Sequence, residues 1–289
     1  MSQTYAQTHQ PTQDAQQGYS SFSQQQYVYP GSQSGHQYGA LPTYNQAFRG
    51  NGGTPGGYPG DEDDDFKYGV SVAQCEVEIR MAFIRKVYTI LATQLGATVL
   101  VGSLFFFNEQ ARNWVQSNQW ASLVSIFGAL GVMLVLFWKR HSSPLNFYLL
   151  GAFTLLEAYS VGTIVTFYSA RVVLQALIIT FALFIGLTLF TMQSKYDFSG
   201  MGSILNIVLW LVVIASLVQI FFPFSSKVDF AIAIVVALLF CGYIVYDTYM
   251  IINRLSPDEY IVASIDLYLD ILNLFLAILR ILNELTSDS

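Results

Sequence analysis

Four carboxylates lie inside long apolar stretches of this sequence, where a charge is costly. Glu157 is near the middle of one stretch, Asp247 is near the end of a later one, and Asp266 and Asp270 lie in the last. A charged side chain at the centre of a membrane-spanning helix costs about 2.5–3.5 kcal/mol on the insertion scale. Acids retained there commonly serve a proton or ion pathway, so these four are the first candidates for chemistry.

Three of the acids are expected to converge at one end of the last two stretches. Asp266 and Asp270 are four residues apart, so they share a helix face, which Asn273 extends by a turn. The helical rise puts Asp247 about 8 Å, Asp266 about 9 Å and Asp270 about 15 Å from the same membrane face. Carboxylates this close cannot all ionise cheaply, so the cluster would bind a proton, a cation, or each in turn. The alternative is that they only hydrogen-bond within the bundle.

A basic pair, Lys139-Arg140, ends the second apolar stretch at the same face as these three acids. Either side chain could reach a carboxylate and close the site. A basic pair at a helix end also acts as a topology anchor, and the residues alone leave both roles open.

The elements that position these residues are apolar stretches long enough to cross a bilayer, which takes about 20 residues. All 8 prolines lie outside them, where helix breaks are expected. Ala92/Gly96 and Ala158/Gly162 are pairs of small residues that would let helices approach closely. The sequence therefore predicts an all-α, polytopic membrane protein with a seven-transmembrane-helix bundle. The seven stretches are Val87–Phe107, Trp120–Trp138, Leu145–Tyr168, Val172–Met192, Ile204–Phe222, Phe230–Ile252 and Tyr260–Leu282.

Composition agrees with this class and excludes others. The chain has 289 residues, of which 53% are apolar and 11% charged, whereas a soluble domain carries about 25% charged residues. The net charge of −6 leaves no basic face for phosphates, so we expect no nucleic-acid partner. Cys75 and Cys241 form no metal or disulfide motif, and we expect no cofactor.

We divide the chain into three parts. Residues 1–70 form a Gln/Tyr/Gly/Pro-rich tail with an acidic run, which we expect to be disordered and cytosolic. Residues 71–86 are an amphipathic pre-membrane segment, and residues 87–285 are the membrane domain. In the tail, Leu41, Pro42 and Tyr44 lie in a short segment that resembles the peptides bound by WW domains.

The distribution of Lys and Arg favours a cytosolic N-terminus. If the last stretch were re-entrant, the C-terminus would be cytosolic as well, and the sequence leaves this open. With the N-terminus inside, the inner basic residues are Lys67, Arg80, Arg85, Lys86, Lys139, Arg140, Lys195 and Arg254, and the outer ones are Arg112, Arg171, Lys227 and Arg280.

Two segments resemble the transmembrane Bax-inhibitor-motif family, on its Lifeguard side. One reads Ile79-Arg80-x-x-Phe83-Ile84-Arg85-Lys86-Val87-Tyr88 before the first span. The other comprises Tyr246-Asp247-Thr248, Asp258-Glu259-Tyr260-Ile261 and Leu267-Tyr268-Leu269-Asp270-Ile271-x-Asn273. The resemblance covers residues 72–285, and the second group is the more specific.

The resemblance implies a bundle with its last helix central, surrounded by the other six. It implies a calcium leak across an intracellular membrane (endoplasmic reticulum, Golgi or vacuole), gated by a pH-sensitive aspartate pair at Asp247 and Asp270. These two would also hold a calcium ion transiently, with Asp266 as a modifier. The family's basic latch maps onto Arg140 or Lys139. Suppression of cell death and of endoplasmic-reticulum stress would follow from lowering stored calcium.

The main alternative is a non-conducting membrane protein whose tail binds cell-death regulators or WW-domain ubiquitin ligases. An intramembrane hydrolase is disfavoured, because the spans contain no histidine for a zinc site or a serine dyad. Two membrane acids would suit an aspartyl protease, but the expected Gly-x-Gly-Asp context is missing. We therefore expect that the chain is not an enzyme, with the lipid bilayer and calcium ions as its partners.

Overall fold

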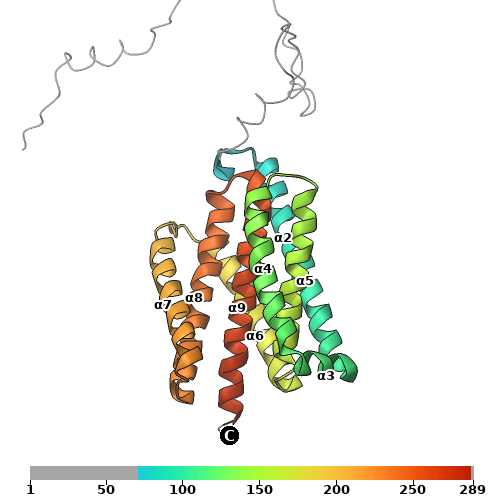
Figure 1. Cartoon of the computed structure of the whole chain (residues 1–289). Helices are drawn as coiled ribbons and strands as arrows, with labels where there is room; N and C mark the ends of the chain where they lie inside the picture. The colour runs from blue at the N-terminus through green and yellow to red at the C-terminus, as the bar shows by residue number, and fades with distance from the viewer. Residues whose placement is uncertain (1–70, 288–289) are drawn as a thin grey trace, which may run out of the picture. The chain divides into compact units, whose positions relative to one another are not determined.

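The computed structural model describes residues 71–287 as a bundle of long helices (Figure 1). The tail with its acidic run, and the segment with Leu41, Pro42 and Tyr44, lie outside the described residues. A short 3-10 helix, η2 (Val72–Gln74), precedes the bundle, and another, η3 (Pro257–Glu259), precedes its last helix. The α-helices are α2 (Val77–Phe107), α3 (Glu109–Ser117), α4 (Gln119–Lys139), α5 (Leu145–Val165), α6 (Ala170–Gln193), α7 (Met201–Phe221), α8 (Ser226–Asn253) and α9 (Tyr260–Ser287).

Seven helices of this described part are long and apolar enough to cross a membrane, which confirms the predicted spans. Only α3 falls short, with nine residues. The ends agree with the turn signals of the sequence, because α7 stops two residues before Pro223 and η3 begins at Pro257. The chain is thus a multi-pass, all-α membrane protein.

The first spanning helix is longer than expected. It begins at Val77, so it includes most of residues 71–86, which we had assigned to a separate amphipathic segment. Ahead of it, η2 is hydrogen-bonded to the end of α8 and to the connection that follows it. The Val72 N–H donates to Leu255 O (2.9 Å), and Ser71 Oγ donates to Asn253 O (2.8 Å). These bonds define one end of the bundle, called here the η2 end. The opposite end carries α3 and is called the α3 end.

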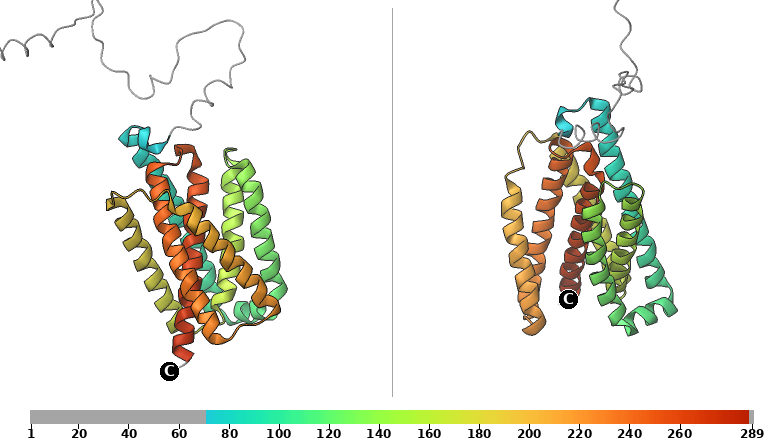
Figure 2. Two further views of the ribbon diagram at one scale, coloured as in Figure 1. Left: turned by 90° about the vertical axis from the view of Figure 1, so that its left-hand side faces the viewer. Right: turned by 45° about the horizontal axis from the view of Figure 1, so that its top comes forward.

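Helix α9 lies at the centre of the bundle, as the last helix was predicted to do (Figure 2). Along the most apolar 18 residues of each helix, the buried share is 72% for α9, 50% for α5 and 6% for α7. It packs on α2, α5, α6 and α8, whereas α4 packs chiefly on α5 and α7 on α8. The other six helices therefore surround it in two layers and not in a single ring.

The last helix crosses the whole bundle. At 1.5 Å per residue its 28 residues span about 42 Å, more than the roughly 30 Å of bilayer hydrocarbon. It starts at the η2 end and finishes at the α3 end, so the described structure has a spanning last helix and not a re-entrant one (Figure 1).

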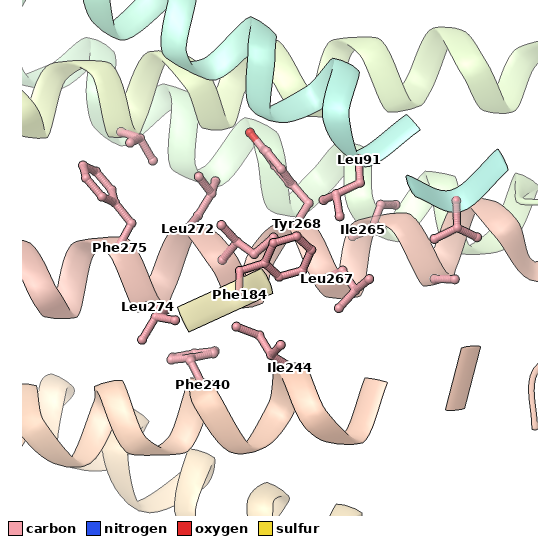
Figure 3. Packing of buried hydrophobic residues seen from close by; sticks show 14 of the residues in the cluster. Leu91, Phe184, Phe240, Ile244, Ile265, Leu267, Tyr268, Leu272, Leu274 and Phe275 are labelled. Atoms are coloured by element: carbon pink, nitrogen blue, oxygen red, sulfur yellow. The ribbon is translucent and has the colours of Figure 1, made fainter. Parts of the chain in front are cut away.

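Apolar side chains of α9 fill the centre (Figure 3). Ile265, Leu267 and Leu274 are completely buried, and α8 contributes Phe240 and Ile244 to the same cluster. Burial on nearly all sides explains the composition of α9, because a helix that is apolar all round fits only the core of a bundle. Two polar residues of α9, Ser264 and Asp270, are therefore buried among apolar side chains.

Candidate ion-pathway site

Asp247 of α8 and Asp270 of α9 form a carboxyl pair in the interior. Their side chains lie within hydrogen-bonding reach of each other, and a hydrogen bond between two carboxyls requires a proton on one of them. Asp270 is 5% exposed, and its Oδ2 atom is buried without a hydrogen-bond partner among the described residues. This unsatisfied oxygen could accept a further hydrogen bond or contact an ion, which would change the bonding of the pair.

Asp266 lies outside this pair. It is half-buried one turn nearer the η2 end, where the charges of Asp247 and Glu259 act on it. Within residues 71–287 no group of three His, Cys, Asp or Glu side chains is close enough to hold a metal ion. The structure thus brings all three acids within electrostatic range of one another, but only Asp247 and Asp270 lie within hydrogen-bonding reach. Asn273, which extends the same helix face, donates its amide to Leu269 O (2.8 Å) of its own helix.

The pairing of Asp247 with Asp270 requires an offset between α8 and α9. Asp247 is six residues before the end of α8 and Asp270 is ten residues after the start of α9. The difference of four residues corresponds to about 6 Å, or roughly one helical turn. Depth counted from the helix ends therefore favoured Asp266, although the predicted end of α8 and the predicted start of α9 were right to within a residue.

Buried hydroxyl groups lie next to Asp247 along α8. The Tyr88 hydroxyl of α2 lies within reach of Thr188 of α6 and of Thr248 of α8, which follows Asp247. All three hydroxyl oxygens are buried, and none of them makes a hydrogen bond of good geometry among the described residues. Sequence analysis missed them, because Thr and Tyr are common in apolar spans. The only signal was that they are polar.

A second polar cluster lies on the other side of α9. The hydroxyls of Tyr268 and Thr98 are 2.8 Å apart, and Figure 3 shows the Tyr268 ring extending from α9 toward α2. Gln94 Nε2 donates to Thr154 Oγ1 (3.1 Å) nearby. Glu157 of α5 is half-buried and its charge acts on Tyr268. Glu157 therefore belongs to this cluster and not to the aspartate pair.

Lys139 and Arg140, the two candidates for the latch, lie at the η2 end of the bundle. Arg140 Nη1 is 3.6 Å from Glu259 Oε1, and its Nε donates to His141 Nε2 (3.0 Å). Lys139 Nζ lies 4.9 Å from the centre of the Trp138 ring. The ion pairs found among residues 71–287 join Arg140 to Glu259 and Arg254 to Asp197, so neither involves Asp247 or Asp270. The latch role taken from the resemblance stays a prediction.

The start of α9 is held by several contacts near Arg140. Lys86 Nζ lies 3.2 Å from the centre of the Tyr260 ring, which also stacks on Phe147 at 5.9 Å. Buried Asn146 donates to Arg140 O (2.9 Å) and lies 3.5 Å from the Tyr260 hydroxyl. These contacts join α2, α4 and α5 to the first turn of the central helix.

A bundle of seven spanning helices with a buried acidic pair beside its central helix defines a polytopic membrane protein with an internal titratable site. The profile of the family described as "Inhibitor of apoptosis-promoting Bax1" matches residues 80–287. The chain belongs to this Bax inhibitor family, as the two sequence segments predicted.

Relatives from distant sources align over most of their lengths. Protein lifeguard 4 of Mus musculus is 46% identical over 79% of this chain and 96% of its own length. Bax inhibitor 1 of Schizosaccharomyces pombe is 44% identical over 78% and 85%. The Golgi anti-apoptotic protein of Vaccinia virus strain Lister is 46% identical over 76% and 92%.

Proposed function

We propose that this protein is a pH-sensitive, calcium-permeable leak channel of an intracellular membrane, with its N-terminus in the cytosol. The observation that carries the proposal is the pairing of Asp247 and Asp270 between α8 and the central helix. Two carboxyls joined by one shared proton respond to pH, because loss of that proton places like charges side by side.

The pair would couple proton binding to the fit between α8 and α9. With the proton in place, the hydrogen bond holds the helices together at this level. After deprotonation, repulsion favours a more open arrangement, and the balance between the two states shifts with pH. This is the chemistry that a gate at the pair requires.

Carboxylates are also the ligands that calcium prefers, but a stable site takes six to eight oxygens. A pair without a third acid in reach would hold calcium only transiently. Weak binding suits conduction, because an ion has to leave each site as readily as it enters. Asp266 nearer the η2 end, and the polar cluster with Glu157 toward the middle, would extend the path as modifiers.

Of the two basic residues, we assign the latch to Arg140. Its ion pair with Glu259 acts on the turn that leads into α9, whereas Lys139 lies against Trp138 of its own helix. Arg140 would thus restrain the end of the central helix nearest the aspartate pair.

The biological role that we propose is suppression of cell death and endoplasmic-reticulum stress through a lowered calcium store. The names of the relatives support the first part, since one is called a Bax inhibitor and another a Golgi anti-apoptotic protein. The second name also supports the Golgi among the candidate membranes, which include the endoplasmic reticulum and the vacuole.

The test is calcium efflux from proteoliposomes that contain the full chain, measured near pH 6, 7 and 8. Asp270→Asn should alter the pH dependence of efflux, because an amide cannot release the shared proton. Asp258→Asn is the matched control, since it removes an acid of the α8–α9 connection and leaves the pair intact. A pH profile of Asp270→Asn identical to that of the wild type would refute the sensor.

A second candidate function is a non-conducting interaction protein that binds cell-death regulators or WW-domain proteins through its tail. The relatives' names favour it to the extent that they refer to inhibition of cell death and not to transport. Deletion of residues 1–65 separates the two candidates. Protection from cell death should disappear with the tail under this candidate and persist under the channel proposal.

A further inference from the structure

An apolar groove of about 410 Å³ lies between α2 and α6, in the half of the bundle nearer the α3 end. Its floor is formed by α9, with Ile271, Leu272 and Phe275. Figure 3 shows Leu272 and Phe275 on the same stretch of α9. The volume lies in the range of known small-molecule pockets, about 300–1,000 Å³.

The groove opens sideways, toward the bilayer. The floor residue Phe275 is 5% exposed, whereas Val99 on the α2 rim is 49% exposed and Phe181 on the α6 rim is 63% exposed. Both rims belong to membrane-spanning helices, so the opening faces hydrocarbon and not water. A cavity with an apolar lining stays dry, and its favourable occupants are apolar groups. The bilayer supplies such a group as a lipid acyl chain.

The mouth of the groove at the α3 end carries basic side chains. Phe106 lines the groove, and the Arg112 guanidinium lies 5.5 Å from the centre of its ring. Arg112 Nη2 donates to Phe106 O, but its Nε is buried without a hydrogen-bond partner among the described residues. Across the groove, exposed Arg171 follows the lining residue Ala170. Neither arginine takes part in the ion pairs recorded for residues 71–287.

Arginines at the end of spanning helices lie at the depth of lipid headgroups, where a phosphate is the complementary charge. Glu109 lies three residues before Arg112 in the sequence, and its carboxylate is exposed. Among residues 71–287 it forms no ion pair with Arg112. All phospholipids supply a phosphate, but an anionic headgroup lacks the ammonium of phosphatidylcholine, which Arg112 and Arg171 would repel. An anionic phospholipid therefore fits both the apolar floor and the basic mouth.

We propose that the groove binds one anionic phospholipid, with an acyl chain lying on Ile271, Leu272 and Phe275 and its phosphate at Arg112. The floor begins at the residue that follows Asp270, so the bound chain contacts the turn of α9 next to the aspartate pair. This lipid site does not depend on ion conduction and stands apart from the proposed function.

Photochemical labelling of the wild-type protein tests the floor. The full chain is reconstituted with a phosphatidylglycerol that carries a diazirine at the end of one acyl chain. We expect labelling at Ile271, Leu272 or Phe275, which are 5–6% exposed and are reached from the bilayer only through the groove. We also expect a loss of about tenfold when unlabelled phosphatidylglycerol competes. Labelling confined to outward residues such as Leu100 and Trp210, which are 72% and 63% exposed, would overturn the proposal.

Two tryptophan variants test the groove by filling it. Val99→Trp places a large ring at the rim, whereas Leu100→Trp places the same ring on the neighbouring residue, which does not line the groove. Native mass spectrometry should detect one phosphatidylglycerol on the wild type and on Leu100→Trp, and about tenfold less on Val99→Trp. Equal occupancy in the two variants would contradict the site.

Arg112→Gln tests the phosphate. The variant should keep the acyl chain but lose, by about tenfold, the preference for phosphatidylglycerol over phosphatidylcholine. An unchanged preference would overturn the headgroup assignment, and so would displacement of the phospholipid by free oleate at equal concentration. If a tryptophan variant fails to fold, labelling of the wild type still decides the floor.

Discussion

Arg140, which follows the last residue of α4, forms an ion pair with Glu259 in the turn before α9, with 3.6 Å between Nη1 and Oε1. The other carboxylate oxygen of Glu259 accepts from the Ser256 N–H (3.4 Å). The Glu259 side chain therefore links the end of α4 to the turn between α8 and α9. The central helix is held at this end by a charged contact that lies outside the apolar core.

This ion pair should contribute little to stability by itself. The two side chains are 38% and 25% exposed, so a coupling free energy of about 0.2–1 kcal/mol is expected. A double-mutant cycle with Arg140→Gln and Glu259→Gln, measured by thermal unfolding in detergent, gives the coupling directly. Lys139→Gln is the control, because Lys139 contacts Trp138 instead. Strictly additive effects of the two substitutions would show that the pair is uncoupled.

The Thr98–Tyr268 contact leads to an asymmetric prediction. Thr98 Oγ1 donates to Gln94 O (2.9 Å), so its only proton is used and Tyr268 must be the donor across the 2.8 Å contact. Tyr268→Phe leaves a buried acceptor with one bond fewer and should cost about 1 kcal/mol of unfolding free energy. Thr98→Val strands a buried hydroxyl donor and should cost more, about 1–3 kcal/mol.

Unfolding of both variants in detergent checks this order. The double variant should be no less stable than Thr98→Val alone, because Tyr268→Phe removes the stranded donor. If Tyr268→Phe proved the more harmful single substitution, Thr98 would have to be the donor, contrary to the hydrogen bond to Gln94.

The number and approximate positions of the spans could be predicted from hydropathy and proline position, although α2 begins ten residues before the expected stretch. The expected stretch Trp120–Trp138 and the helix Gln119–Lys139 differ by one residue at each end. Helix α3 was missed, because it is a polar helix of nine residues started by the Asn108 cap, whose side chain accepts from Ala111 N–H. A search for apolar runs cannot detect a helix of that kind.

The candidate site could be predicted only in part. Buried acids are conspicuous in a sequence, so Asp247, Asp266 and Asp270 were found. The resemblance to the family implied the pair Asp247 and Asp270, but helical rise alone did not, because the pairing depends on the offset of α8 and α9. That offset is set by packing and not by residue spacing. The hydroxyls of Tyr88, Thr188 and Thr248 gave no signal, because a hydroxyl hardly changes the hydropathy of a span.

Gly162 and Gly96 belong to similar small-residue pairs in the sequence but should respond oppositely to a larger side chain. A Cβ atom on Gly162 would lie 3.0 Å from Phe105 Cδ2 and 3.4 Å from Gly102 Cα, whereas one on Gly96 meets no atom within 4 Å. Gly162→Leu should therefore force α2 and α5 apart and cost about 1–3 kcal/mol. Gly96→Leu is the matched control and should be neutral or stabilising, because leucine favours a helix more than glycine does. Equal thermal stability of the two variants would contradict the close contact.

Asp197, in the connection between α6 and α7, should make the stability of the protein depend on acid pH. Hydrogen bonds from Ser199, through its side chain and its N–H (2.9 Å to Oδ1), lower the pKa of this exposed carboxyl from 3.8 to about 2. Tyr249 and the charge of Arg254, 3.3 Å away, act in the same direction. A lowered pKa means that the folded state favours the carboxylate. The stabilisation is therefore present above the unfolded pKa of about 3.9 and is lost as the pH falls toward 2.

Asp197→Asn should lower the unfolding midpoint at pH 7, and the difference from the wild type should shrink on acidification through this window. Ser199→Ala should show a smaller version of the same dependence. A difference between Asp197→Asn and the wild type that stays constant from pH 7 down to about pH 2 would mean that the carboxyl keeps its ordinary pKa.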